Sequence, residues 1–122
     1  MNRESKFKAW DKKKGEFVFE GALADIRHAG GKLNFTTWDW IEYTGRKDKN
    51  GVEIYEGYLV KWIDEFGENP NIFKVEYDEA QWVIVPISDS LKGWYLGGKD
   101  LEVIGNIYEN PELLQEKKLA PN

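Results

Sequence analysis

The sequence contains no cysteine in 122 residues, and its single histidine is His28. The lack of cysteine excludes disulfide bonds, thiolate zinc sites, iron–sulfur clusters and cysteine nucleophiles. With one histidine and no cysteine, a transition-metal site would depend almost wholly on carboxylates. We therefore expect no catalytic residue, no metal ligand and no cofactor.

Long apolar runs are also missing. The first ten residues are polar and charged, and no stretch approaches the roughly 18 apolar residues needed to span a bilayer. We therefore expect a cytoplasmic protein that does not contact a membrane.

Basic residues are outnumbered, with 17 against 22 acidic residues and a net charge of −5. Residues 1–14 are instead positively charged overall, because they contain six basic and two acidic residues. An acidic domain is a poor general binder of phosphate backbones, although this basic segment could contact an anion locally. We interpret Lys12–Lys14 as a solvated turn.

Aromatic residues are plentiful, with six each of tryptophan, tyrosine and phenylalanine. Such rings favour strands, and they also supply most of the energy at protein-binding hot spots. Whether they are core or exposed stays open at this point. The candidate binding residues are the tryptophans of the expected later strands, Trp38, Trp40, Trp62, Trp82 and Trp94.

Short alternating or apolar segments separated by turn residues are typical of antiparallel β-structure. The connection Thr44–Gly51 ends in Asn-Gly, so Gly51 should adopt a positive φ. The expected strands are Lys6–Trp10, Glu16–Glu20, Leu33–Tyr43, Val52–Tyr55, Tyr58–Asp64, Ile72–Tyr77, Trp82–Ile87, Trp94–Leu96 and Leu101–Tyr108.

This spacing of short strands and turns predicts a single, mainly β domain. We expect a small antiparallel SH3-like barrel over residues 51–108, and a β-sandwich is the competing interpretation. Residues 1–45 would form an N-terminal β extension with a hairpin, and residues 46–109 the barrel core. A short helix would occupy residues 110–120, with Asn110 as its cap and Pro111 in its first position.

Three segments carry a family resemblance: FKAWD at residues 7–11, YTGRKDKNGVEIYEG at 43–57 and LEVIGNIYENPELL at 101–114. Together and in this order they resemble the YopX family, small proteins encoded by phages and prophages of bacteria. The resemblance implies a mobile-element setting and no catalytic residues. One departure is visible, because relatives usually carry an acidic residue directly after the Tyr-Glu-Gly step, where this chain has Tyr58.

The motif residues also have a physical interpretation of their own. Glycines permit the backbone of tight turns, and short polar side chains hydrogen-bond neighbouring backbone groups. We therefore interpret them as structural. They are Tyr43, Thr44, Gly45, Asp48, Gly51, Tyr55, Gly57, Gly105, Asn106, Tyr108, Asn110 and Pro111.

Three functional hypotheses follow. The first is a non-catalytic accessory protein of a phage or prophage that binds a host or phage protein and forms a homo-oligomer. The second is a nucleic-acid-binding SH3-like module that uses the basic N-terminal segment. The third is an enzyme with a carboxylate-bound metal. We favour the first, because no motif indicates a reaction.

Overall fold

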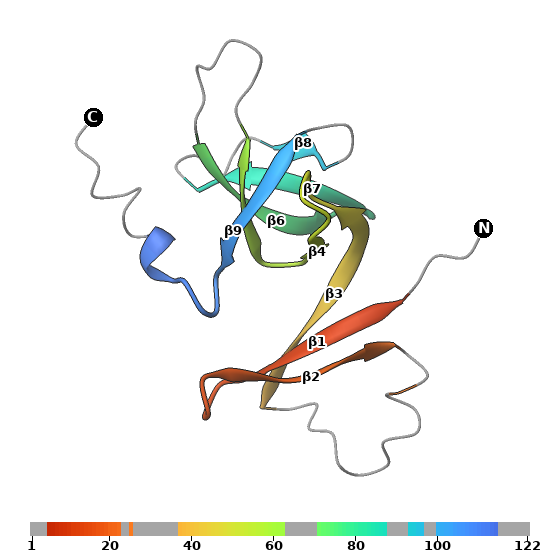
Figure 1. Cartoon of the computed structure of the whole chain (residues 1–122), viewed down its shortest axis with the longest axis vertical. Helices are drawn as coiled ribbons and strands as arrows, with labels where there is room; N and C mark the ends of the chain where they lie inside the picture. Colours follow the sequence, from red (N-terminus) through yellow and green to blue (C-terminus); the bar gives the residue numbers. More distant parts are fainter. Residues whose placement is uncertain are drawn as a thin grey trace.

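The structure is a computed structural model, and it describes residues 5–22, 25, 37–62, 71–87, 93–96 and 100–114. It is mainly β, as predicted, with two antiparallel sheets and little helix. The strands, labelled in Figure 1, are β1 (Lys6–Asp11), β2 (Glu16–Ala22), β3 (Trp38–Lys47), β4 (Glu53–Tyr55), β5 (Tyr58–Trp62), β6 (Asn71–Asp78), β7 (Gln81–Pro86), β8 (Trp94–Tyr95) and β9 (Leu101–Asn106).

The first sheet has the order β2-β1-β3-β4, so the predicted N-terminal hairpin forms and β2 is the outermost of the described strands on its side. Its turn is closed by the Gly15 N–H, which donates to the Asp11 carbonyl at 2.8 Å. The Asp11 carboxylate also accepts hydrogen bonds from the Lys13 and Lys14 N–H groups. Lys12–Lys14 are exposed, as expected for a solvated turn.

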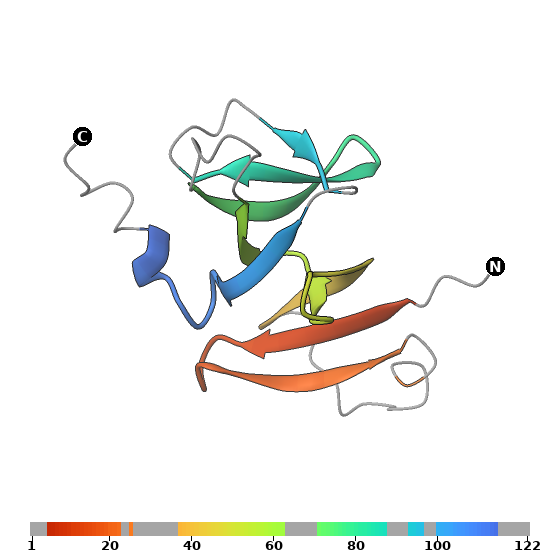
Figure 2. The ribbon, with the colours of Figure 1, turned by 45° about the horizontal axis from the view of Figure 1, so that its top comes forward.

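The second sheet has the order β8-β7-β6-β5-β9. In the β6–β7 hairpin, Glu79 and Ala80 both adopt positive φ, at 49° and 66°. Two consecutive residues in this region are typical of the turn that matches strand twist. Figure 2 shows the β1–β2 hairpin on one side of the molecule and the β5–β7 strands on the other, with β3 and β4 between them.

The core lies between the two sheets and joins both of them. Tyr55, Phe73 and Ile41 are its largest fully buried side chains. Figure 1 shows β3 extending from the β1–β2 hairpin to the region of β4. The other buried members of the cluster are Tyr43, Ile54, Tyr58, Val60, Val75, Ile84, Leu96 and Leu101.

One sequence-based boundary and the expected architecture differ from the structure. The segment expected as a polar connection after Tyr43 continues as strand to Lys47, because Gly45 at φ 88° accommodates a break in register within β3. The described strands form no closed barrel, and the SH3-like assignment is not confirmed.

The expected C-terminal helix begins where predicted, with a helical turn at residues 112–114. Its continuation from Gln115 to Ala120 lies outside the described residues, as do Leu33–Thr36 and Ile63–Asp64 of two expected strands. Among the described residues, no helix is long and apolar enough to cross a membrane.

Candidate functional site

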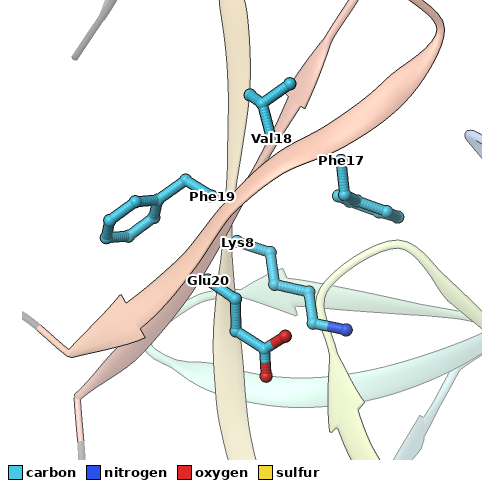
Figure 3. Close-up of a pocket in the computed structure, with 5 residues that line it drawn as sticks. All are labelled: Lys8, Phe17, Val18, Phe19 and Glu20. Atoms are coloured by element: carbon cyan, nitrogen blue, oxygen red, sulfur yellow. The ribbon is translucent and has the colours of Figure 1, made fainter. Parts of the chain in front are cut away.

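The candidate site lies at β2, where an extra residue interrupts the pairing with β1. Ala9 is opposite Phe19 and Trp10 is opposite Phe17, so Val18 has no partner of its own. Such a bulge changes the alternation of side chains across a strand. Figure 3 shows the result, with Phe17 and Phe19 on opposite sides of β2.

Each phenylalanine has its own aromatic partners. Phe17 packs edge-on against Trp10 at 4.9 Å and against Tyr108 at 6.0 Å between ring centroids. Phe19 packs against Trp40 at 5.4 Å. The bulge therefore attaches β2 to the core on one face and to β3 on the other.

An open hollow of about 250 Å³ adjoins this strand. It is lined by Lys8, Phe17, Val18, Phe19 and Glu20, which combine apolar walls with one cation and one anion (Figure 3). Lys8 and Glu20 are directly opposite each other across β1 and β2.

Lys8 does not turn toward Glu20, and no ion pair joins it to a carboxylate of the described residues. Its ammonium donates to the Tyr58 hydroxyl at 2.8 Å. It lies 4.8 Å from the ring centroid of Tyr55 and 5.5 Å from those of Phe17 and Tyr58. Aromatic faces attract a cation, so these rings hold the ammonium between the sheets.

Tyr55 is 1% exposed, and its hydroxyl has no hydrogen-bond partner in the part of the chain that the structure describes. Burial, followed by the charges of Glu53 and Glu20, raises the pKa of this hydroxyl above its usual value. A buried hydroxyl without a partner is costly, so this group lowers the stability of the core beneath Lys8.

Two other lysines of the hairpin are paired with carboxylates. Lys6 forms an ion pair with Glu53, and Lys12 lies 3.4 Å from an oxygen of Asp39. Lys8 therefore differs from these two neighbours, because aromatic rings and a neutral hydroxyl surround its charge.

A second hollow of about 260 Å³ lies beside the Glu56–Gly57 turn and includes Glu76 and Tyr108 in its lining. Burial, then the charge of Glu42, raises the pKa of Glu56. Burial, then the charges of Asp39 and Glu56, raises the pKa of Tyr108 to about 12. Glu76 is paired with Lys74 at 2.9 Å.

Within the described residues, no group of three or more acidic or histidine side chains could hold a metal ion. His28 lies outside the described residues.

The five candidate tryptophans occupy three separate places. Trp38 and Trp40 are 6.0 Å apart on β3, and Trp62 and Trp94 are 5.9 Å apart beside Phe73. Trp82 instead packs against Tyr77 at 4.8 Å. Trp94 is 38% exposed. They contribute to both sheets, and Trp62 and Trp82 both pack against the core.

The central motif is built around the buried Asp48. One of its oxygens accepts from the Asn50 and Val52 N–H groups, and the other accepts from Val103 in β9. Burial alone would raise the pKa of Asp48, but these three hydrogen bonds outweigh it and lower the pKa. The carboxylate therefore joins the loop to the second sheet.

The rest of this motif supports the same connection. The Thr44 hydroxyl donates to the Ile54 carbonyl, which links β3 to β4, and Tyr43 packs on Tyr55. Gly51 has φ 86°, as the Asn-Gly turn predicts. Gly57 has φ 85°, and its N–H donates to the Val75 carbonyl.

The C-terminal motif forms a compact turn after β9. The Asn106 side chain accepts from the Tyr108 and Glu109 N–H groups. Asn110 does not cap the helix with its side chain as expected, because its amide oxygen accepts from the Asn106 N–H instead. Gly105 is required beside it, since a Cβ would lie 2.5 Å from that oxygen. Pro111 follows, and its carbonyl accepts from Leu114.

Sequence reasoning placed Lys8 within a basic segment and did not single it out, nor did it single out Phe17 or Glu20. The alternation of Lys6, Lys8 and Trp10 on one face of β1 was the available signal. It could not show that this face is directed at the second sheet, because that depends on pairings between residues far apart in sequence.

The comparisons with known proteins agree with the resemblance in the motifs. The family model described as YopX protein matches residues 6–115. The chain belongs to the YopX family. No curated protein matches significantly.

Two crystal structures have a similar fold. Protein EF1440 from Enterococcus faecalis aligns with a TM-score of 0.59 and 22% identity, over 93% of this chain and 99% of that one. The protein yopX from Bacillus subtilis aligns with a TM-score of 0.56 and 16% identity, over 88% of this chain and 96% of that one. In this YopX chain, Tyr58 follows the Tyr-Glu-Gly step directly, and its hydroxyl accepts from Lys8.

Proposed function

We propose that this YopX protein is a non-catalytic, phage- or prophage-encoded accessory protein that binds another protein in the bacterial cytoplasm. The observation that carries the proposal is the hollow at the edge of the first sheet, where apolar walls adjoin a caged cation. Concave sites that combine apolar area with a few placed polar groups are typical of recognition.

The edge position of β2 favours a protein partner. An extended segment of another protein can pair with the backbone of an edge strand, while one side chain enters a neighbouring hollow. Val18 has no partner in β1, so the bulge marks the place where the strand departs from a flat edge.

The charges of the hairpin weigh against a nucleic-acid ligand. Lys6 and Lys12 are already paired with Glu53 and Asp39, and the whole chain has a net charge of −5. Binding to a phosphate backbone needs several free cations along one surface. A carboxylate-based enzyme has no support from a metal-binding cluster in the described parts of the chain.

The proposal is tested by affinity capture from a lysate of Bacillus subtilis, the organism of one similar structure. The bait is compared with a Val18→Lys variant and with a Glu79→Lys control in the exposed β6–β7 turn. We expect a captured protein that is lost with Val18→Lys and retained with the control. Equal capture by all three baits would show that the β2 edge is not the binding surface.

A further inference from the structure

Resting on the proposed function, we infer that the hollow beside β2 receives an acidic side chain from an extended segment of the partner protein, with Lys8 as its counter-ion. The first reason is the state of Lys8. Its ammonium is held by three rings and one neutral hydroxyl, so it keeps hydrogen-bonding capacity for an anion.

The second reason is the place of Lys8, which lines the hollow while its ammonium lies over the ring of Tyr55. An ionised acceptor in the hollow would find this ammonium as a donor. Charge-assisted hydrogen bonds of this kind are roughly twice as strong as neutral ones.

The third reason is size and location. The hollow of about 250 Å³ has room for about eight water molecules, which is enough for one carboxylate side chain. Its apolar walls come from the edge strand β2, so a backbone lying along β2 would present a side chain to it. Glu20 lines the same hollow, and its negative charge repels an anion. Removing that charge should therefore strengthen binding of an acidic side chain.

The probe is a capped, fluorescein-labelled octapeptide of alternating valine and glutamate, titrated into the full chain and followed by fluorescence anisotropy. We expect saturable binding below about 1 mM, a range accessible to this method. Peptides with glutamine or lysine in place of glutamate should bind at least about tenfold more weakly. No binding of the glutamate peptide, or equal binding of the lysine peptide, would overturn the inference.

The protein variants locate the effect. Lys8→Met should weaken binding of the glutamate peptide about tenfold, and Glu20→Gln should strengthen it about two- to threefold by removing a repulsive charge. Lys14→Gln is the matched control, because it removes one positive charge from the exposed turn of the same hairpin. If Lys14→Gln and Lys8→Met lost the same affinity for the glutamate peptide, the net charge of the protein would explain the effect. That result would contradict a site at Lys8.

Further measurements distinguish a failure of this inference from a failure of the proposed function and from unfolding of a variant. Because Lys8→Met removes the hydrogen bond to Tyr58 and the cation beside three rings, its thermal melt is recorded, and Glu20→Gln serves as the decisive variant if Lys8→Met unfolds. A single-stranded oligonucleotide that binds as tightly as the glutamate peptide would contradict the protein ligand. If the lysate bait captures a protein with unchanged strength in Glu20→Gln and Lys8→Met, the acidic preference fails while the proposed function survives.

Discussion

Asp48 is a buried carboxylate whose two oxygens accept three backbone hydrogen bonds, two from its own loop and one from β9. Single polar side chains of this kind form hydrogen bonds that attach the loops to the neighbouring strands. Thr44 and Asn106 act in the same way at two other connections. The family motif can therefore be explained residue by residue as structure.

Replacing Asp48 with alanine should lower the free energy of unfolding by about 2–4 kcal/mol, because three N–H groups lose a charged acceptor. Chemical denaturation at pH 7 measures it, with Asp78→Ala at the exposed end of β6 as control. A loss equal to that of the control would show that the three hydrogen bonds contribute nothing.

The same side chain gives a pH dependence. Since the pKa of Asp48 is lowered in the folded state, its contribution is present above the unfolded pKa of about 4 and is lost as pH falls through the folded pKa. The difference in stability between wild type and Asp48→Ala should therefore shrink below about pH 4. A difference that stays constant down to pH 2 would contradict this assignment.

Gly51→Val should cost about 1–3 kcal/mol in the free energy of unfolding, through backbone strain at φ 86°. A Cβ there would meet no atom within 4 Å, so crowding does not contribute. Gly51→Asn should cost less, because asparagine tolerates this region better. Equal costs for the two variants would indicate a cause other than backbone conformation.

At the scale of elements, the sequence predicted the strands and hairpins well and their ends poorly. Alternation and turn residues are local signals, and they located both hairpins and the start of the C-terminal turn at Pro111. They could not show that β3 passes through Gly45 to Lys47, because that depends on the partner strand β4.

Sequence reasoning did not single out the hollow beside β2. Tryptophan content directed attention to Trp38, Trp40, Trp62, Trp82 and Trp94, which the structure places in three groups. The cage around Lys8 depends on contacts with Tyr55 and Tyr58, which lie far from it in the sequence. Contacts between residues far apart in the sequence cannot be predicted from the local pattern of polar and apolar residues.

The β1–β2 hairpin packs against Tyr108 in the C-terminal segment, and this contact predicts how stability changes at high pH. Tyr108 packs on Trp10 and Phe17, and its pKa is raised to about 12. Because the folded pKa exceeds the unfolded value of about 10, the stabilising effect is complete below pH 10 and is lost as pH rises toward 12.

The stability of the wild type should therefore fall more steeply between about pH 10 and 12 than that of Tyr108→Phe, as measured by urea unfolding. Tyr55→Phe is measured in parallel, since the Tyr55 pKa is also raised. Identical slopes for wild type and Tyr108→Phe would show that the Tyr108 hydroxyl does not titrate differently in the folded state.

At the scale of the whole molecule, large apolar side chains remain on the surface. Val52, Tyr77, Trp94 and Tyr95 are exposed, with Tyr95 at 65%. We predict a homo-oligomer, so light scattering after size-exclusion chromatography should give a mass of at least twice 14.2 kDa.

The contribution of the C-terminal turn is tested with the double variant Leu113→Ser and Leu114→Ser, which keeps the Asn106–Asn110 hydrogen bonds. Association of this variant equal to wild type would place the interface elsewhere, with Tyr95 and the Trp38–Trp40 pair as the next residues to change. A monomeric mass for the wild type across a wide concentration range would contradict oligomer formation.

The central claim is that a protein partner binds at the edge of the first sheet beside Lys8. A photo-crosslinking amino acid at Val18, compared with the same group at Glu79, tests it most directly in cells of the bacterial host. The account predicts a discrete covalent adduct with one partner from position 18, absent from position 79 and diminished by Lys8→Met. Adducts from position 79 alone, or the same adducts from both positions, would contradict it.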